Sequence, residues 1–152
     1  MLQRTPQTAD ARQVALRLLA RRDHAVGELT RKLRERGFAA VDIASVITDF
    51  EREGWLSDQR FAESFVRARL ERGQGPLRIR ADLMQRGLNS ELADQALAEA
   101  CQEDSTLRER AEAARVKRFG PAQPADRRAW GQQARFLAQR GFPADTIRSL
   151  FD

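Results

Sequence analysis

A six-residue pattern, L-x-[EQ]-R-G-[FL], occurs three times in this chain of 152 residues. The copies occupy residues 33–38, 83–88 and 137–142, so their glycines lie 50 and 54 residues apart. Apolar residues follow six and ten positions after each glycine. This spacing is typical of a helix that ends at a left-handed glycine, makes an apolar contact and gives way to a new helix. The chain is therefore predicted to use one helical unit three times.

Helical periodicity continues along nearly the whole chain, and no strand-like alternation is present. In the first unit it predicts helices over about 8–22, 25–36 and 40–53. Three short helices bury little apolar surface alone, so we expect the units to lean on one another. The predicted fold is an all-α, elongated and curved array of three tandem three-helix repeats, with repeat boundaries at 1–56, 57–103 and 104–152.

The stretch from Gly54 to Leu88 is predicted to hold two helices joined by residues 73–76. Ser57 or Asp58 suits the amino-terminal cap of the first helix, because a side-chain oxygen there accepts an unpaired amide proton. Gly73 suits its left-handed end, and Pro76 suits the first position of the second helix. Asn89 and a capping box at residues 106–109 are predicted to start the helices that follow.

Both central helices depart from the usual division into one apolar and one polar side. In the first, Arg69 and Arg72 fall inside the apolar arc that Phe61, Phe65 and Ala68 define, at the end of the helix. In the second, apolar residues lie on two nearly opposite sides: Leu77, Ala81, Met84 and Leu88 on one, Ile79 and Leu83 on the other. Two interpretations stay open. These surfaces pack against a neighbouring unit, or a partner binds among Arg69, Arg72, Arg78 and Arg80.

The helix over 25–36 is predicted to present a charged outer side. Glu28 lies on it, four residues before Lys32, and such a pair stabilises a helix by only ~0.3 kcal/mol. Arg31, Lys32 and Arg34 on this side are further candidates for contact with a partner.

The net charge of +5 is unevenly distributed: +2 in residues 1–56, −1 in 57–103 and +4 in 104–152. A basic surface attracts nucleic acid by releasing counterions from phosphates, or attracts an acidic protein surface. The charge alone does not choose between these two partners.

No pattern predicts catalysis, a cofactor or a metal site. The single Cys101 excludes an internal disulfide and is expected to pack in a helix, and the only histidine, His24, is expected to cap and pack. Trp55 and Trp130 are predicted to anchor the core or the contacts between units, with base stacking as the alternative. Without an apolar run long enough for a membrane span or a signal peptide, a cytoplasmic protein is expected.

Two segments resemble the RecX family. Residues 18–24, with Glu28-Leu29 and Lys32-Leu33, are similar to that family's first-repeat motif. Residues 54–62, followed by Arg69, Gly73, Gly75-Pro76, Arg78-Ile79 and Leu83, are similar to its central motif. The resemblance covers most of residues 11–100 and is looser over 101–152. Ala25 and Ser57 depart from the family's usual Ser and Asp, and Asp23 and Asp58 are expected to cap instead.

The resemblance implies nine helices in three repeats and a regulator, mainly an inhibitor, of the RecA recombinase. Such proteins bind RecA and lie in the groove of the RecA–single-stranded-DNA filament, which lowers its recombinase, ATPase and coprotease activities in DNA repair and the SOS response. Single- and double-stranded DNA are further candidate partners, and we expect a monomer. Two rivals stay open: a sequence-independent DNA-binding protein that competes for single strands, and a helical scaffold for an unrelated partner.

Overall fold

The computed structural model describes residues 6–103 and 107–151, and this part of the chain forms nine α-helices and no strand. The predicted all-α class is confirmed, and the predicted helix limits agree with the observed ones to within about two residues. The helices are α1 (Pro6–Arg21), α2 (Val26–Glu35), α3 (Ala40–Glu53), α4 (Asp58–Glu71), α5 (Pro76–Gln85), α6 (Ser90–Glu103), α7 (Leu107–Phe119), α8 (Arg127–Arg140) and α9 (Ala144–Ser149).

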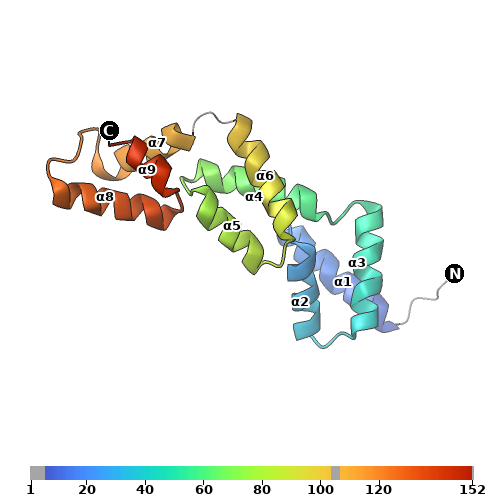
Figure 1. Cartoon of the computed structure of the whole chain (residues 1–152). Helices are drawn as coiled ribbons and strands as arrows, with labels where there is room; N and C mark the ends of the chain where they lie inside the picture. The colour runs from blue at the N-terminus through green and yellow to red at the C-terminus, as the bar shows by residue number, and fades with distance from the viewer. Residues whose placement is uncertain (1–5, 104–106, 152) are drawn as a thin grey trace.

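The helices gather into three units of three that follow one another as an elongated array (Figure 1). Each unit has its own hydrophobic cluster, which includes the fully buried Phe50 in the first, Ile79 in the second and Leu137 in the third. The predicted array of three helical repeats is therefore confirmed. The capping box predicted at residues 106–109 begins outside the described residues.

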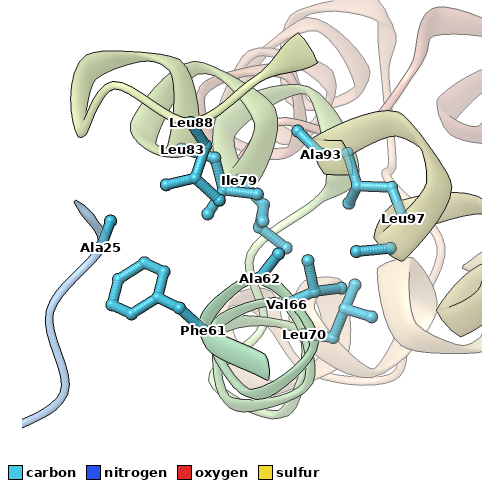
Figure 2. Packing of buried hydrophobic residues seen from close by; sticks show 11 residues of the cluster. Ala25, Phe61, Ala62, Val66, Leu70, Ile79, Leu83, Leu88, Ala93 and Leu97 are labelled. Carbon is cyan, nitrogen blue, oxygen red and sulfur yellow. The ribbon is translucent and has the colours of Figure 1, made fainter. Parts of the chain in front are cut away.

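The middle cluster settles which side of each central helix faces inward. Ile79 and Leu83 are fully buried in α5, whereas Leu77 on the other side is 57% exposed. In α4, Phe61, Ala62, Val66 and Leu70 are buried, and Ala68 is exposed. Figure 2 shows these side chains converging, with Ala25 of the first unit facing Phe61. The middle core therefore extends across the boundary with the first unit.

The glycine at the end of the middle helix of each unit has a positive φ, as the repeated pattern predicts. Two of these glycines also contact the preceding unit. A Cβ on Gly27 of α2 would lie 3.4 Å from the Cα of Gly87, and a Cβ on Gly75 would lie 2.4 Å from the carbonyl carbon of Gly141. The carboxyl end of α5 thus meets the amino end of α2, and the carboxyl end of α8 meets the amino end of α5 (Figure 1). We call these contacts the first and the second joint.

Capping at the first joint agrees with the prediction for Ser57 but not for Asp58 or Asp23. Ser57 caps α4, since its Oγ accepts from the Arg60 amide at 3.3 Å. Asp58 instead caps α2 of the first unit, because its carboxylate accepts from the Val26 amide at 2.7 Å. The expectation that Asp23 caps α2 is wrong, because no side chain of its own unit caps this helix. A contact between units is invisible to a rule that reads only local sequence.

Two hydrogen bonds between backbone groups join the second and third units at the second joint. The Gly75 amide donates to the Arg140 carbonyl at 2.7 Å, and the Leu77 amide donates to the Gly141 carbonyl at 3.0 Å. These amides lie at the amino end of α5, where no helical partner exists for them, and Pro76 between them has no proton to donate. The third unit therefore caps α5 through the carbonyls of residues 140 and 141, at the carboxyl end of α8.

Candidate binding surface

Glu28 is buried at the first joint, so its predicted place on the outer side of α2 is wrong. Its carboxylate accepts from Arg22 at 2.7 Å and from Arg86 of the second unit at 2.9 Å. Burial acts to raise the pKa of Glu28, but the hydrogen bond from Arg22 and the charges of Arg22 and Arg86 outweigh it and hold the pKa below its usual value. The carboxylate thus binds arginines from both units and not Lys32.

Lys32 lies beside His24, which is 3% exposed and packs at the same joint. The Nδ1 of His24 lies 2.9 Å from the Arg22 carbonyl, so it carries the proton, and Nε2 accepts from the Lys32 ammonium at 2.9 Å. Burial, with the charges of Arg22 and Lys32, lowers the pKa of His24 despite the hydrogen bond to that carbonyl. Burial and the charge of Arg22 also lower the pKa of Lys32. The packing role expected of His24 is confirmed.

Two of the four central candidate arginines are held by contacts within the second unit. The guanidinium of Arg69 lies 4.5 Å from the centre of the Phe65 ring and 3.6 Å from the carboxylate of Asp82. Arg80 binds Asp94 on α6, with Nε 2.7 Å from the carboxylate. These contacts explain how Arg69 lies in an apolar arc without an unpaired charge.

The other two, Arg72 and Arg78, are exposed, and neither forms an ion pair with any described residue. Arg72 follows the last turn of α4, and Arg78 lies in the first turn of α5 with its backbone against Gly141. On α2, Arg34 is also exposed and outside the ion pairs of the described chain, while Arg31 lies 3.8 Å from Glu35 in a solvent-exposed pair. The structure therefore separates the candidates into arginines that hold the fold and arginines open to a partner.

A cleft of about 310 Å³ opens beside the first joint. Its lining includes Leu19, Asp23 and His24 from the first unit, together with Trp55, Arg60 and Phe61. Trp55 is 60% exposed, so the prediction that it anchors a core is wrong. Trp130 is 38% exposed and packs in part on Phe151, with ring centres 5.4 Å apart.

Sequence reasoning missed two arginines of the third unit, Arg118 and Arg140. Their guanidiniums lie over the rings of Phe119 and Phe136, which meet edge to face with centres 5.3 Å apart. The spacing of four residues between Phe136 and Arg140 is a signal for this contact, because such residues are neighbours on a helix surface. Arg115, in contrast, is fully buried and bound to Glu112 and Gln133, which is a structural role.

The chemistry of these surfaces is that of binding. Among the described residues, no group of three or more histidine, cysteine or acidic side chains could hold a metal ion. The helices of the described chain include none that is long and apolar enough to cross a membrane. Exposed guanidiniums without carboxylate partners are suited to carboxylates or phosphates, which they bind through paired N–H donors.

The chain is similar to proteins of the RecX family along most of its length. Residues 11–50, 57–97 and 107–151 match the family models for the first, second and third three-helix domains of RecX. Regulatory protein RecX of Halorhodospira halophila is 46% identical over 138 residues, which cover 91% of this chain and 84% of that protein. Regulatory protein RecX of Pseudomonas putida strain W619 is 45% identical over 139 residues, which cover 91% of this chain and 87% of that protein.

Solved structures show the same fold. The crystal structure of RecX from Lactobacillus salivarius superposes with a TM-score of 0.80 at 22% identity, and the match covers 94% of this chain and 93% of that one. A second crystal structure of a regulatory protein RecX gives a TM-score of 0.77 at 24% identity and covers 93% of this chain and 70% of that one.

Proposed function

Because the chain belongs to the RecX family, we propose that it binds the RecA recombinase and regulates its activity. The target is the filament that RecA forms on single-stranded DNA, and the main effect is inhibition of its recombinase, ATPase and coprotease activities. The place of this activity is DNA repair and the SOS response in the cytoplasm. The role is regulatory and not enzymatic, in keeping with the name of the relatives.

The observation that carries this proposal is the joined, elongated array with exposed arginines in more than one unit. Arg34 lies in the first unit, whereas Arg72 and Arg78 lie in the second, and all three are exposed without an ion pair among the described residues. Contacts from linked units add to one another because the second contact forms at a high effective concentration. A repeating filament is a partner that offers such linked contacts.

Competition for single strands is the alternative, and the net charge of +5 favours it. The two functions differ in stoichiometry. A protein that acts on the filament inhibits when it is far scarcer than RecA, whereas a competitor must cover the DNA. ATP hydrolysis by preformed RecA filaments, measured with this protein well below the RecA concentration, separates them.

We expect inhibition at such ratios, and we expect the double variant Arg72→Glu/Arg78→Glu to lose it at least several-fold. The matched control is Arg52→Glu/Arg148→Glu, which makes the same change in net charge on exposed arginines that each pair with an aspartate three residues earlier. Equal loss in both variants would assign the effect to total charge, and unchanged inhibition by the first variant would remove Arg72 and Arg78 from the contact. Inhibition only at amounts that saturate the DNA would refute the filament mechanism.

A further inference from the structure

Lys32 of α2 is paired with the only histidine of the chain. Its ammonium lies 2.9 Å from the Nε2 of His24, while the Nδ1 of His24 is directed at the Arg22 carbonyl. His24 is buried, and Lys32 is partly exposed. Because burial lowers the pKa of His24, its ring is neutral near pH 7 and Nε2 remains an acceptor. A nucleophile, a base within hydrogen-bond reach and a third group that orients the base are the arrangement by which proteins activate a weak nucleophile.

The surroundings of Lys32 favour its neutral amine. Burial of the side chain, followed by the charge of Arg22, lowers the pKa of Lys32. Glu28 acts in the opposite direction, but its carboxylate is already bound by Arg22 at 2.7 Å and by Arg86 at 2.9 Å. The charged and titratable groups that face Lys32 come from the end of α1, from α2 and from the end of α5: Arg22, His24, Glu28, Arg31 and Arg86.

Two of these arginines reach solvent and select the kind of reagent that approaches the amine. The side chains of Arg22 and Arg31 are 46% and 62% exposed. Arg31 lies 3.8 Å from Glu35 in an exposed pair, and such weak pairs leave a guanidinium available to a second anion. Guanidiniums bind phosphate through paired N–H donors. A reagent that carries its reactive group on a phosphate is therefore drawn to Lys32, whereas a neutral reagent is not.

We propose that Lys32 is a preferred site of acylation by acyl phosphates. The Lys32 ammonium gives one proton to the Nε2 of His24, which passes it to water. The lone pair of the amine then attacks the carbonyl carbon of the acyl group, and the bond from that carbon to the phosphate oxygen breaks. Inorganic phosphate leaves with the electron pair of that bond and takes the second proton from the nitrogen. The proposal is separate from the regulation of RecA, because it concerns only the chemistry of this side chain.

The product keeps the contact with His24 and loses the charge. An acylated nitrogen retains one proton, which still donates to the Nε2 of His24, so the packing at the first joint is preserved. The positive charge that Lys32 adds to α2 beside Arg31 and Arg34 disappears. Acylation thus changes the charge of this helix without removing a hydrogen bond.

The test treats the full chain with acetyl phosphate at pH 7.5 and follows acetylation of each lysine by mass spectrometry of its peptides. Lys117, the only other lysine, is exposed on α7 and serves as the internal reference. The variants are His24→Gln, which removes the base, and Arg31→Gln, which removes one exposed charge. Arg52→Gln is the matched control, because it removes an equally exposed charge from α3, where Arg52 pairs with Asp49. Circular dichroism melts verify that the variants stay folded.

We expect Lys32 to be acetylated at least fivefold faster than Lys117, and its rate to rise at a lower pH than that of Lys117. The ratio of the two rates is expected to fall at least threefold in His24→Gln and twofold in Arg31→Gln, with Arg52→Gln unchanged. Equal rates at both lysines, or the same dependence on pH, would overturn the proposal. An equal fall in Arg31→Gln and Arg52→Gln would do so as well, since it would assign the effect to total charge. If His24→Gln does not fold, the pH profile of the unaltered chain and the two arginine variants still decide.

Discussion

Replacing Gly75 with alanine tests whether the second joint is a backbone contact that leaves no room for a side chain. Gly75 has a φ of −93° and a ψ of 166°, which alanine adopts without strain, so the substitution probes only the space around the residue. The added Cβ would lie 2.4 Å from the carbonyl carbon of Gly141 and 2.5 Å from both its oxygen and the Phe142 nitrogen. All three are backbone atoms, which cannot move aside as the end of a flexible side chain can.

The third unit must therefore shift away, and the two hydrogen bonds of the joint lengthen or break. Each contributes about 0.5–1.5 kcal/mol to stability, so their loss destabilises the docked array by roughly 2 kcal/mol. For a chain of this size, that change corresponds to a fall in Tm of about 4–8 °C where the whole array unfolds together. The amides of Gly75 and Leu77 also lose their acceptors, so their hydrogen exchange becomes much faster.

Hydrogen exchange and thermal melts of Gly75→Ala give the measurement, with Gly131→Ala as its control. Gly131 lies inside α8 and has no atom within 4 Å of an added Cβ, so alanine there is expected to stabilise by about 0.5–1 kcal/mol through helix propensity. An unaltered Tm with protected amides at residues 75 and 77 would refute the close contact. A fall in Tm without faster exchange at those amides would show that the damage lies outside the joint.

Two further changes test the first joint. Asp58→Ala removes the cap of α2, so we expect it to lower the free energy of unfolding by about 1 kcal/mol and to expose the Val26 amide to hydrogen exchange. The control Ser57→Ala removes the cap of α4 and leaves the Val26 amide protected. Protection of this amide in both variants would contradict the assignment of Asp58 as the cap of α2. Glu28→Gln removes the charge that Arg22 and Arg86 share, and because both arginines are partly exposed we expect a loss of about 1–3 kcal/mol, below that of a fully buried pair. Since folding lowers the pKa of Glu28, the advantage of the unaltered chain in denaturant melts is full above the ordinary value of 4.5 and shrinks as the pH falls through the folded-state pKa; an advantage independent of pH would contradict the ion pair.

The sequence was sufficient for the helices because their signals are local. Gly54, Gly73 and Gly141 end helices with a positive φ, and Pro76 starts α5, as expected from residues next to them in the chain. The repeated pattern also predicts the units, because each copy marks the same turn between the second and third helix. Periods and caps of this kind survive any arrangement of the units.

The arrangement itself depends on contacts between distant residues, and there the sequence was insufficient. Glu28 reads as a surface residue of an amphipathic helix, yet Arg86, 58 residues later, helps to bury it. The candidate arginines show the same limit. Arg72 and Arg80 are both predicted from the sequence as candidates for contact with a partner, but Asp94 on the neighbouring helix α6 binds Arg80 and not Arg72. Periodicity identifies which residues point outward without telling which of them meet a carboxylate there.

The three units also differ in how the amino end of their second helix is capped, and this difference explains the joints. Ala25 precedes α2 and Gly75 precedes α5, and neither helix has a side-chain cap from its own unit. The next unit supplies the missing acceptors in both cases, through Asp58 or through the carbonyls of residues 140 and 141. Asp126 precedes α8 and caps that helix itself, because its carboxylate accepts from the Ala129 amide at 2.8 Å.

The repeated glycines follow the same logic in the opposite direction. Gly87 and Gly141 end their own helices and also touch the preceding unit, whereas Gly37 of the first unit has nothing within 4 Å of an added Cβ. In the second and third units this glycine turn both ends a helix and contacts the preceding unit, whereas in the first unit it only ends a helix. The amino ends of α2 and α5, which lack a side-chain cap of their own, are capped by the next unit, so the joints stabilise these two helices as well as the arrangement of the units. A regulator built this way presents the exposed arginines of separate units in a set order along one array, which an assembly of independently hinged domains would not do.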